Sequence, residues 1–145
     1  MLKISKKADY AMIALKHLAL NRQLGASLSA GDIAGNYGIS ATLMAKVLQQ
    51  LARGGLVAAR HGAMGGYTLA KDPARISALD AICAVEGPLS ITSCVTHRGE
   101  CIQVSTCTVR EPLRRVNDSI LEVLGRVTIS QMADERSSQV VEIRL

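Results

Sequence analysis

Apolar residues recur at intervals of three and four along the first 53 residues, a spacing typical of helices with one buried face. The first such pattern predicts a helix that Ser5 caps and that continues to about Asn21. Its inward face is expected to contain Ala8, Met12, Leu15 and Leu18/Ala19. The chain is therefore expected to begin with an amphipathic helix.

Two shorter helices are predicted next. Ser29 and Asp32 have the spacing of a capping box and start a helix that ends at Gly38. Ser40 is a further capping residue and starts a helix that two glycines stop after about Arg53. The inward positions of this helix are Leu43/Met44, Val47/Leu48 and Leu51. Two short helices joined by a tight glycine-containing turn form a helix-turn-helix.

Residues 56–70 predict a strand, a glycine turn and a returning strand, because glycine permits positive φ and close approach between backbones. A hairpin directly after a helix-turn-helix is a wing. Arg60 and His61, followed by Gly62, lie near its tip and could reach a minor groove or phosphates. A hairpin without any ligand would have the same local pattern.

The polar face of the helix over 40–53 carries small and hydrogen-bonding side chains together with cations. Its members are Ala41, Thr42, Ala45, Lys46, Gln49, Gln50 and Arg53. Such side chains enter a major groove and read base edges, while cations contact phosphates. An ordinary helical hairpin can have a solvated face of the same kind, but the wing that follows favours double-stranded DNA as the partner.

Two more helices are predicted after residue 76. Ser77 and Asp80 have capping-box spacing and start a helix that Gly87-Pro88 ends, with Cys83 inside it as a small core residue. A long helix over 109–125 has an apolar stripe of Val109, Leu113, Val116, Ile120 and Leu124. The apolar stripe of this helix could pack against the core of its own domain. We favour its pairing with a second copy, because DNA readers commonly act as symmetric dimers.

Charge is distributed unevenly over the 145 residues, whose net charge is +5. Residues 1–75 contain ten Lys or Arg and three acidic residues, whereas residues 76–145 contain seven and nine. The basic half favours a polyanionic partner, although a solvated basic surface would look the same. The first seven residues lack the apolar core and cleavage site expected of a signal peptide, and no apolar run approaches the roughly 18 residues that cross a membrane. We expect a cytoplasmic protein with no membrane partner and with reduced thiols.

Cys94, Cys101 and Cys107 lie in a segment of loop-like composition, about 89–108, and thiolates on such a backbone can hold a soft metal centre. Zinc bound by three thiolates and His97 is one alternative. The gaps of six and five residues are, however, longer than those usual in structural zinc sites. A disulfide switch that needs no metal is another alternative. No nucleophile elbow or phosphate loop is present, so we predict that the protein is not an enzyme.

Taken together, these segments resemble the bacterial winged-helix iron–sulfur regulators that include IscR, NsrR and RirA. The similarity runs from Met1 to about Ala133. Besides the cysteines, it rests on Ile4-Ser-Lys-Lys-Ala-Asp9-Tyr10-Ala11, Asp32-Ile-Ala, Gly38-Ile-Ser40, Gly55-Leu-Val, Gly65-Gly-Tyr67 with Leu69-Ala, and Ile76 with Ala81-Ile82. The segments Ala84-Val-Glu-Gly87-Pro88-Leu and Val127-Thr-Ile-Ser-Gln-Met look most like the branch that regulates the SUF cluster-assembly operon.

The expected fold is mainly α with a small β-hairpin. Residues 1–76 are expected to form a winged helix-turn-helix DNA-binding domain. Residues 77–133 would form the cysteine loop and a long dimerisation helix, with one further turn at 130–133. Residues 134–145 would be a flexible tail.

The resemblance implies a homodimeric repressor of cluster-assembly genes with one iron–sulfur cluster (2Fe-2S or 4Fe-4S) per subunit. The cluster would be held by Cys94, Cys101 and Cys107. Residues on the reading face of the third helix would be Ser40, Thr42, Leu43 and Lys46, with Gln49 on the same polar face. In the wing, many relatives carry Arg directly before the glycines, whereas here His61 takes that place and Arg60 precedes it.

The fourth cluster ligand is left open by the sequence. IscR-like relatives use a His three residues after the last Cys, and here that residue is Arg110, which cannot ligate. Asp9 matches the position from which NsrR-like relatives supply an Asp in trans, although an Asp there also suits the first turn of a helix. His97 is the alternative, Glu100 is a weaker one, and a thiol, water or another exogenous ligand would serve otherwise.

Overall fold

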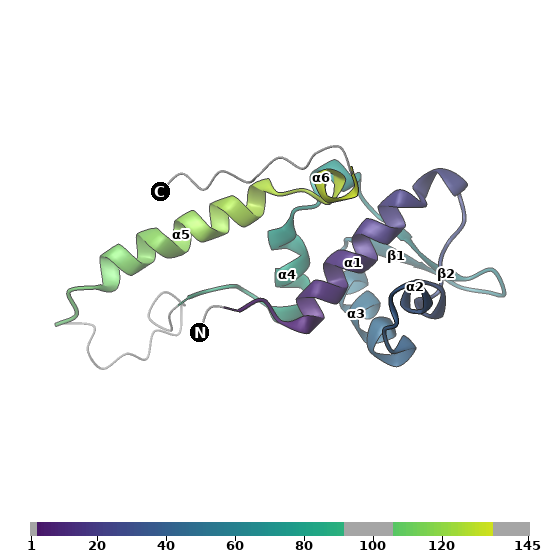
Figure 1. Cartoon of the computed structure of the whole chain (residues 1–145), viewed down its shortest axis with the longest axis horizontal. Coiled ribbons are helices and arrows are strands. Elements are labelled where there is room, and N and C mark those ends of the chain that lie inside the picture. The colour runs from purple at the N-terminus through teal and green to yellow at the C-terminus, as the bar shows by residue number, and fades with distance from the viewer. Residues whose placement is uncertain (1–2, 92–105, 135–145) are drawn as a thin grey trace.

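The structure, a computed structural model, describes residues 3–91 and 106–134 (Figure 1). Its elements in chain order are α1 (Lys6–Leu20), η1 (Arg22–Leu24), α2 (Ala30–Tyr37), α3 (Ala41–Arg53), β1 (Val57–Arg60), β2 (Gly66–Leu69), η2 (Pro73–Arg75), α4 (Ala78–Glu86), α5 (Arg110–Arg126) and α6 (Ile129–Ala133). The described chain is mainly helical with one antiparallel hairpin, so the predicted fold class is confirmed.

Serine side chains begin the helices at the predicted positions. Ser5 accepts a hydrogen bond from a first-turn N–H of α1, at 3.1 Å. Ser29 and Asp32 make both bonds of the capping box at α2, at 3.1 and 3.0 Å. Ser40 and Ser77 cap α3 and α4. These bonds supply partners to N–H groups that the first helical turn leaves unsatisfied, which fixes where each helix begins.

The hydrophobic core lies where α1 packs against α3, α4 and α6. Its largest fully buried side chains are Leu15, Ile33, Met44, Val47, Leu48, Leu51, Ile76 and Ile129. The buried face of α1 is rich in alanine, and Ala11 and Ala14 are completely buried. Met12, which was predicted in the inward stripe, is partly buried and packs against this core.

The hairpin pairs Val57 with Leu69 and Arg60 with Gly66. Its second strand is also bridged on the other side by Leu28, through backbone bonds of 3.1 and 2.7 Å to Tyr67. A Cβ at Gly66 would lie 2.6 Å from the Leu28 carbonyl, so only glycine fits there. The sequence predicted the hairpin but not this third segment of backbone.

Helix α6 returns the end of the described chain to the core. The Ala78 N–H donates to the Val127 carbonyl, and the Ile129 N–H donates to the Ile76 carbonyl, both at 2.8 Å. Ile129 is fully buried in the same hydrophobic cluster as α1. The predicted turn at 130–133 is confirmed as α6, and its packing on α1 fixes the C-terminal end of α5.

Helix α5 extends away from the bundle around α1 (Figure 1). Leu124, near its C-terminal end, packs on the core, whereas Val116 is 48% exposed and Val109 is 54% exposed. The predicted apolar stripe is therefore only partly covered by the described chain. Within residues 3–91 and 106–134, no helix combines the length and apolar content needed to span a bilayer.

Candidate DNA-binding surface and cysteine segment

Helix α3 separates its two faces cleanly. Met44, Val47, Leu48 and Leu51 are buried, whereas the opposite face exposes Thr42, Lys46 and Gln49, and its capping residue Ser40 is also exposed. Leu43 is half-buried, between the two faces. Because the buried side fixes the rotation of the helix, the hydroxyl, ammonium and amide groups point away from the core together. The structure thus presents the predicted reading residues on one surface.

Gln50 was predicted on the polar face of α3 but has a different role. Its side-chain nitrogen lies 3.5 Å from the Val85 carbonyl of α4, at the outer limit of a hydrogen bond. Its side-chain oxygen is buried, and within the described part of the chain it has no hydrogen-bond partner. Gln50 therefore joins two helices and is not available for reading a base.

The wing holds its exposed residues on a braced turn. Arg60 ends β1, and His61 and Gly62 follow it, all exposed to solvent. Gly62 has φ +107°, and its carbonyl accepts a bond from the Gly65 N–H at 2.9 Å. A side brace comes from Ser27, whose hydroxyl donates to the Met64 carbonyl at 2.7 Å. These bonds fix the backbone that carries Arg60 and His61, while their side chains remain accessible.

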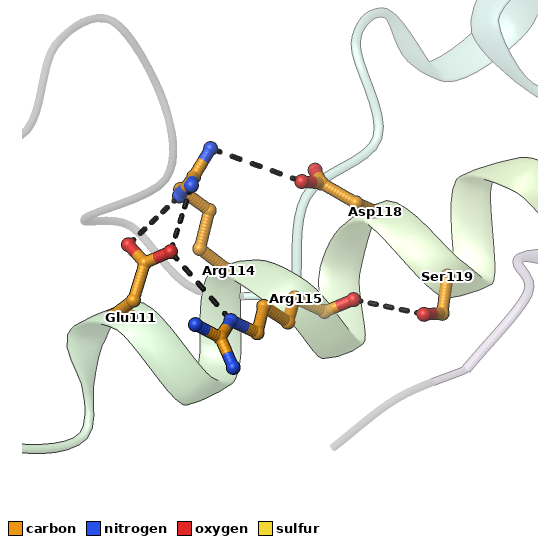
Figure 2. Close-up of polar contacts among 5 residues, drawn as sticks. All are labelled: Glu111, Arg114, Arg115, Asp118 and Ser119. Atoms are coloured by element: carbon orange, nitrogen blue, oxygen red, sulfur yellow. Dashed lines mark hydrogen bonds and ion pairs between the residues drawn. The ribbon is translucent and has the colours of Figure 1, made fainter. Parts of the chain in front are cut away.

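The polar face of α5 is internally paired (Figure 2). Arg114 donates to both carboxylate oxygens of Glu111 at 2.7 and 3.0 Å and lies 3.9 Å from Asp118. The bond from Arg114 lowers the pKa of Glu111, and the same bond raises the pKa of Arg114. Arg115 lies 3.8 Å from Glu111. These charges compensate one another on the face away from the apolar stripe.

Some of the candidate metal ligands lie in the described part of the chain, and the others lie outside it. Cys94, His97, Glu100 and Cys101 lie outside the described residues. Cys107 is half-buried, three residues before α5, and Arg110 is the first residue of that helix. Within residues 3–91 and 106–134, no three His, Cys, Asp or Glu side chains come together as a metal site. The ligand set therefore stays a prediction.

Two further residues bear on that prediction. The side chain of Asp9, in the first turn of α1, is 44% exposed, and its carboxylate lies 3.9 Å from the Lys6 ammonium. The Asp9 carboxylate is therefore accessible to a group that another subunit binds. Cys83 was predicted to be a small core residue, but it is only half-buried within α4 and is not part of the buried hydrophobic cluster.

An apolar groove of ≈ 860 Å³ runs beside α5. Its walls come from the start of the chain, α4, residues 88–91 and the stripe of α5, including Ile4, Leu89, Ile91, Leu113, Val116 and Ile120. At one side the Ser5 hydroxyl, which caps α1, also donates to the Glu86 carboxylate at the end of α4. The beginning of α1 and the end of α4 are thereby held together beside the groove.

Asn117 was not recognised from the sequence. It is 3% exposed, and its side-chain oxygen accepts a hydrogen bond from the Ile91 N–H at 3.0 Å. A signal was present, because Asn117 stands four residues after Leu113 and three before Ile120, inside the apolar stripe. A polar residue at an inward position is expected to have a specific partner.

Comparison with known proteins gives one family. The model of the Rrf2 family, described as an iron-dependent transcriptional regulator, matches residues 4–135. A Neisseria meningitidis protein named as an HTH-type transcriptional regulator is 31% identical over 138 residues, which cover 94% of this chain and 91% of that protein.

Two solved structures have the same fold over most of the chain. CymR, described as the global cysteine regulator of B. subtilis, is 31% identical with a TM-score of 0.73, covering 92% of this chain and 97% of that one. IscR of T. potens is 28% identical with a TM-score of 0.72, covering 96% and 92%. The winged-helix arrangement and the predicted absence of an enzyme fold agree with these relatives.

Proposed function

The chain belongs to the Rrf2 family of transcriptional regulators, and we propose that it is a homodimeric repressor that couples DNA binding to a cysteine-bound iron–sulfur cluster. The observation that carries the DNA-binding part is the arrangement of α3 and the wing. The buried face of α3 fixes the direction of Thr42 and Lys46, and the hairpin carries Arg60 on a hydrogen-bonded backbone.

On double-stranded DNA, these side chains would contact different parts of the duplex according to their charge. Lys46, Arg60 and His61 would contact phosphates or the minor groove, whereas Thr42 and Gln49 would face base edges in the major groove. The remaining predicted contacts are Ser40 and Leu43 at the start of α3 and Gly62 in the wing turn, where glycine lets the backbone approach closely. The excess of basic residues in 1–75 supports the same assignment.

The predicted cluster ligands fit iron by the chemistry of their donors. Cys94, Cys101 and Cys107 supply three soft thiolates, the usual ligands of 2Fe-2S and 4Fe-4S clusters. The family description as iron-dependent supports the same cofactor. Asp9 of the partner subunit would be the fourth ligand, since its carboxylate is accessible, with His97 as the alternative. A bound cluster would supply a redox-sensitive centre whose loss alters DNA binding.

The homodimer would form through the apolar side of α5. Val116 and the groove beside it offer an uncovered apolar surface, and a second copy of the same helix matches it in character. The target genes would be those of SUF cluster assembly, from the resemblance of residues 84–89 and 127–132 to that branch. The protein would then act in the cytoplasm.

A thiol switch is the second candidate function. One of the similar structures is described as a global cysteine regulator, and the three cysteines of residues 94–107 provide thiols that oxidation could join without a metal. In that case two of Cys94, Cys101 and Cys107 would form a disulfide on oxidation. A zinc site made by the three thiolates and His97 is a separate alternative.

Anaerobic purification followed by iron, sulfide and zinc analysis tests the cofactor. Coloured protein with iron and sulfide is expected, and replacement of Cys94, Cys101 or Cys107 by Ala should remove both, whereas Cys83→Ala should retain them. Colourless protein with stoichiometric zinc would replace the cluster by a zinc site. Colourless, metal-free protein that forms a disulfide with peroxide would favour the thiol switch.

DNA binding is tested by its dependence on salt. A dimer with about 6–10 phosphate contacts should lose roughly 10³–10⁵ in affinity between about 50 and 200 mM salt. Lys46→Ala and Arg60→Ala should weaken binding to all sequences, whereas Thr42→Ala should relax base preference. Salt-independent binding, or binding confined to single strands, would contradict the winged-helix assignment.

A further inference from the structure

A small cavity beside the wing is lined by two arginines from distant parts of the chain. Arg22 is the first residue of η1, directly after α1, and Arg60 ends β1 of the wing. The cavity has a volume of ≈ 210 Å³, which leaves room for several water molecules of about 30 Å³ each. Thr68 of β2 adds a hydroxyl group to the same wall, and none of the described residues that line the cavity is acidic. The cavity therefore offers two cations and a hydrogen-bonding group to whatever enters it.

The backbone around the wing explains why these two arginines meet. Leu28 pairs with Tyr67 along the edge of β2 that β1 leaves free, through two backbone hydrogen bonds. Gly66 stands opposite Arg60 in the hairpin, and its missing side chain gives the Leu28 backbone room to approach. In Figure 1 the chain that leaves α1 passes the hairpin on its way to α2. The segment from Arg22 to Leu28 is thus carried alongside the wing.

The positive charge of the cavity is only loosely compensated. Within the described part of the chain Arg22 has one ion-pair partner, Asp72, with 3.9 Å between Nη1 and Oδ2, and the two side chains are 52% and 55% exposed. The Asp72 carboxylate also accepts a hydrogen bond from the Ala74 N–H at 2.9 Å. No carboxylate of the described residues forms an ion pair with Arg60. Two like charges on one cavity repel each other, and an anion bound between them would remove that repulsion.

We propose that this cavity, the Arg22–Arg60 site, binds a backbone phosphate of the DNA that α3 and the wing contact. The N–H groups of a guanidinium form a fork that matches phosphate oxygens, so one arginine from each segment would hold the same phosphate. Phosphate contacts fix the register of a protein on the duplex without reading its sequence. Arg22 would thereby hold the wing in place from outside the helix-turn-helix and the hairpin. This inference rests on the DNA-binding function proposed above and adds a contact to it.

The test compares variants of the full-length protein. Arg22→Gln removes the charge at similar length, and Arg22→Lys keeps the charge without the fork. Asp72→Asn removes the competing carboxylate but retains an oxygen that can accept from the Ala74 N–H. Arg115→Gln is the matched control, because Arg115 is also an exposed arginine with a loose ion pair, 3.8 Å from Glu111, on the helix that extends away from the bundle (Figure 1). Thermal denaturation of each variant establishes that it is folded.

The measured quantity is the affinity for a mixed-sequence duplex of about 30 base pairs, long enough for two half-sites, between about 50 and 200 mM salt. A dimer of Arg22→Gln lacks two phosphate contacts. The slope of log K against log salt should therefore become shallower by about 1.8, and the loss of affinity over this range should be about tenfold smaller than in the wild type. Arg22→Lys should keep the wild-type slope, and Arg115→Gln should match the wild type. Asp72→Asn should bind about twofold to fivefold more tightly, since an exposed ion pair has about that strength.

A double variant decides whether the two arginines hold the same phosphate. Arg22→Gln combined with Arg60→Gln should weaken binding by less than the product of the two separate factors, because the second change removes part of a contact that is already lost. A loss equal to the product would mean that the two side chains act on different phosphates, which contradicts a shared site.

Further results would overturn the proposal in distinguishable ways. An unchanged slope in Arg22→Gln, with duplex binding intact, would remove the Arg22–Arg60 site and leave the proposed function standing. Weaker binding in both Arg22→Gln and Asp72→Asn would mean that their ion pair supports the fold, because both variants break that pair. If Arg22→Gln loses binding of inorganic phosphate but keeps the wild-type slope with DNA, the cavity serves a free anion. Absence of duplex binding by the wild type would overturn the proposed function as well.

Discussion

Helices α3 and α5 have the same kind of sequence pattern and opposite environments. In α3, Met44, Val47, Leu48 and Leu51 are completely buried by the rest of the described chain. In α5 the only buried residue is polar Asn117, while Val116 remains 48% exposed. An apolar stripe therefore predicts which face of a helix will be covered, but not whether its own chain covers it.

This difference has an energetic consequence. A fully buried aliphatic side chain contributes about 1.5–3 kcal/mol, so α3 is stabilised within one chain whatever the protein concentration. The stripe of α5 reaches comparable burial only if another surface covers it. Its contribution then depends on concentration, as for any association between folded subunits. The following experiments separate the two cases.

The largest loss of stability is expected when the buried face of α3 is changed. Leu48→Ala should lower the free energy of unfolding by about 2–5 kcal/mol, because it removes a fully buried side chain and leaves a cavity. Chemical denaturation at two protein concentrations measures the loss, which should be the same at both. Leu24→Ala is the matched control: Leu24 is 76% exposed, and its change should stay within about 0.5 kcal/mol. Equal losses in the two variants would contradict the burial described for α3.

The next effect is expected on α5. Val116→Asp places a charge in the exposed stripe and should raise the dimer dissociation constant at least about 100-fold, because a buried unpaired carboxylate is strongly unfavourable. Sedimentation equilibrium measures the constant. Asp118→Ala, on the paired polar face of the same helix, should leave it nearly unchanged. An intact dimer in Val116→Asp would mean that α5 is covered by something other than a second copy.

A smaller effect is expected at the start of α3. Ser40→Ala should cost about 1 kcal/mol of stability, within a range of about 0.5–2, because the Leu43 N–H loses its capping acceptor. Thermal denaturation measures it. Helix α5 has no side-chain cap hydrogen bond at Val109, so Val109→Ala should not cause a comparable loss. Similar losses of stability in Ser40→Ala and Val109→Ala would mean that the side-chain cap of α3 does not distinguish it from α5.

The smallest effects are expected on acidification. The backbone N–H of Ser29 and then its hydroxyl lower the pKa of Asp32 below its ordinary value of 3.8, and Arg114 lowers that of Glu111 below 4.5. A lowered folded-state pKa adds stability above the unfolded-state value, and this is lost as pH falls through the folded-state value. Asp32→Ala and Glu111→Ala should therefore differ from the wild type near neutral pH and converge with it below those pKa values. Denaturation between about pH 7 and pH 2 provides the measurement. A difference in stability that persists at the acid end would contradict the assignment.

Local chemistry explains why much of the fold could be predicted. The serine caps and the glycines that end α2 and α4 act within a few residues, so their effect is visible in the sequence. The hairpin follows from its glycine turn for the same reason. These signals also identify the exposed face of α3, because the caps and the apolar spacing together fix the rotation of the helix.

The unpredicted features all depend on contacts between distant residues. The bridge of Leu28 to Tyr67, the contact of Gln50 with Val85 and the bond of Asn117 to Ile91 each join separate elements. Periodicity assigns a residue to a face but does not identify its partner. The cysteine spacing likewise indicates a soft-metal or redox chemistry, whereas the arrangement of Cys94 and Cys101 in space stays a prediction.

The hydrogen bond between the Ile91 N–H and Asn117 also determines where the length of the chain can change. It holds the chain at Ile91 against α5, and the chain enters the same helix at Arg110, about 10 Å along the axis from Asn117. Doubling the length of such a connection costs only about 0.6 kcal/mol, so insertions and deletions within 92–105 need not disturb the helix. A single residue inserted between Arg110 and Asn117 is a different event, because it would rotate one attachment point by about 100° relative to the other. Length variation among related chains is therefore expected before α5 and not within its first two turns.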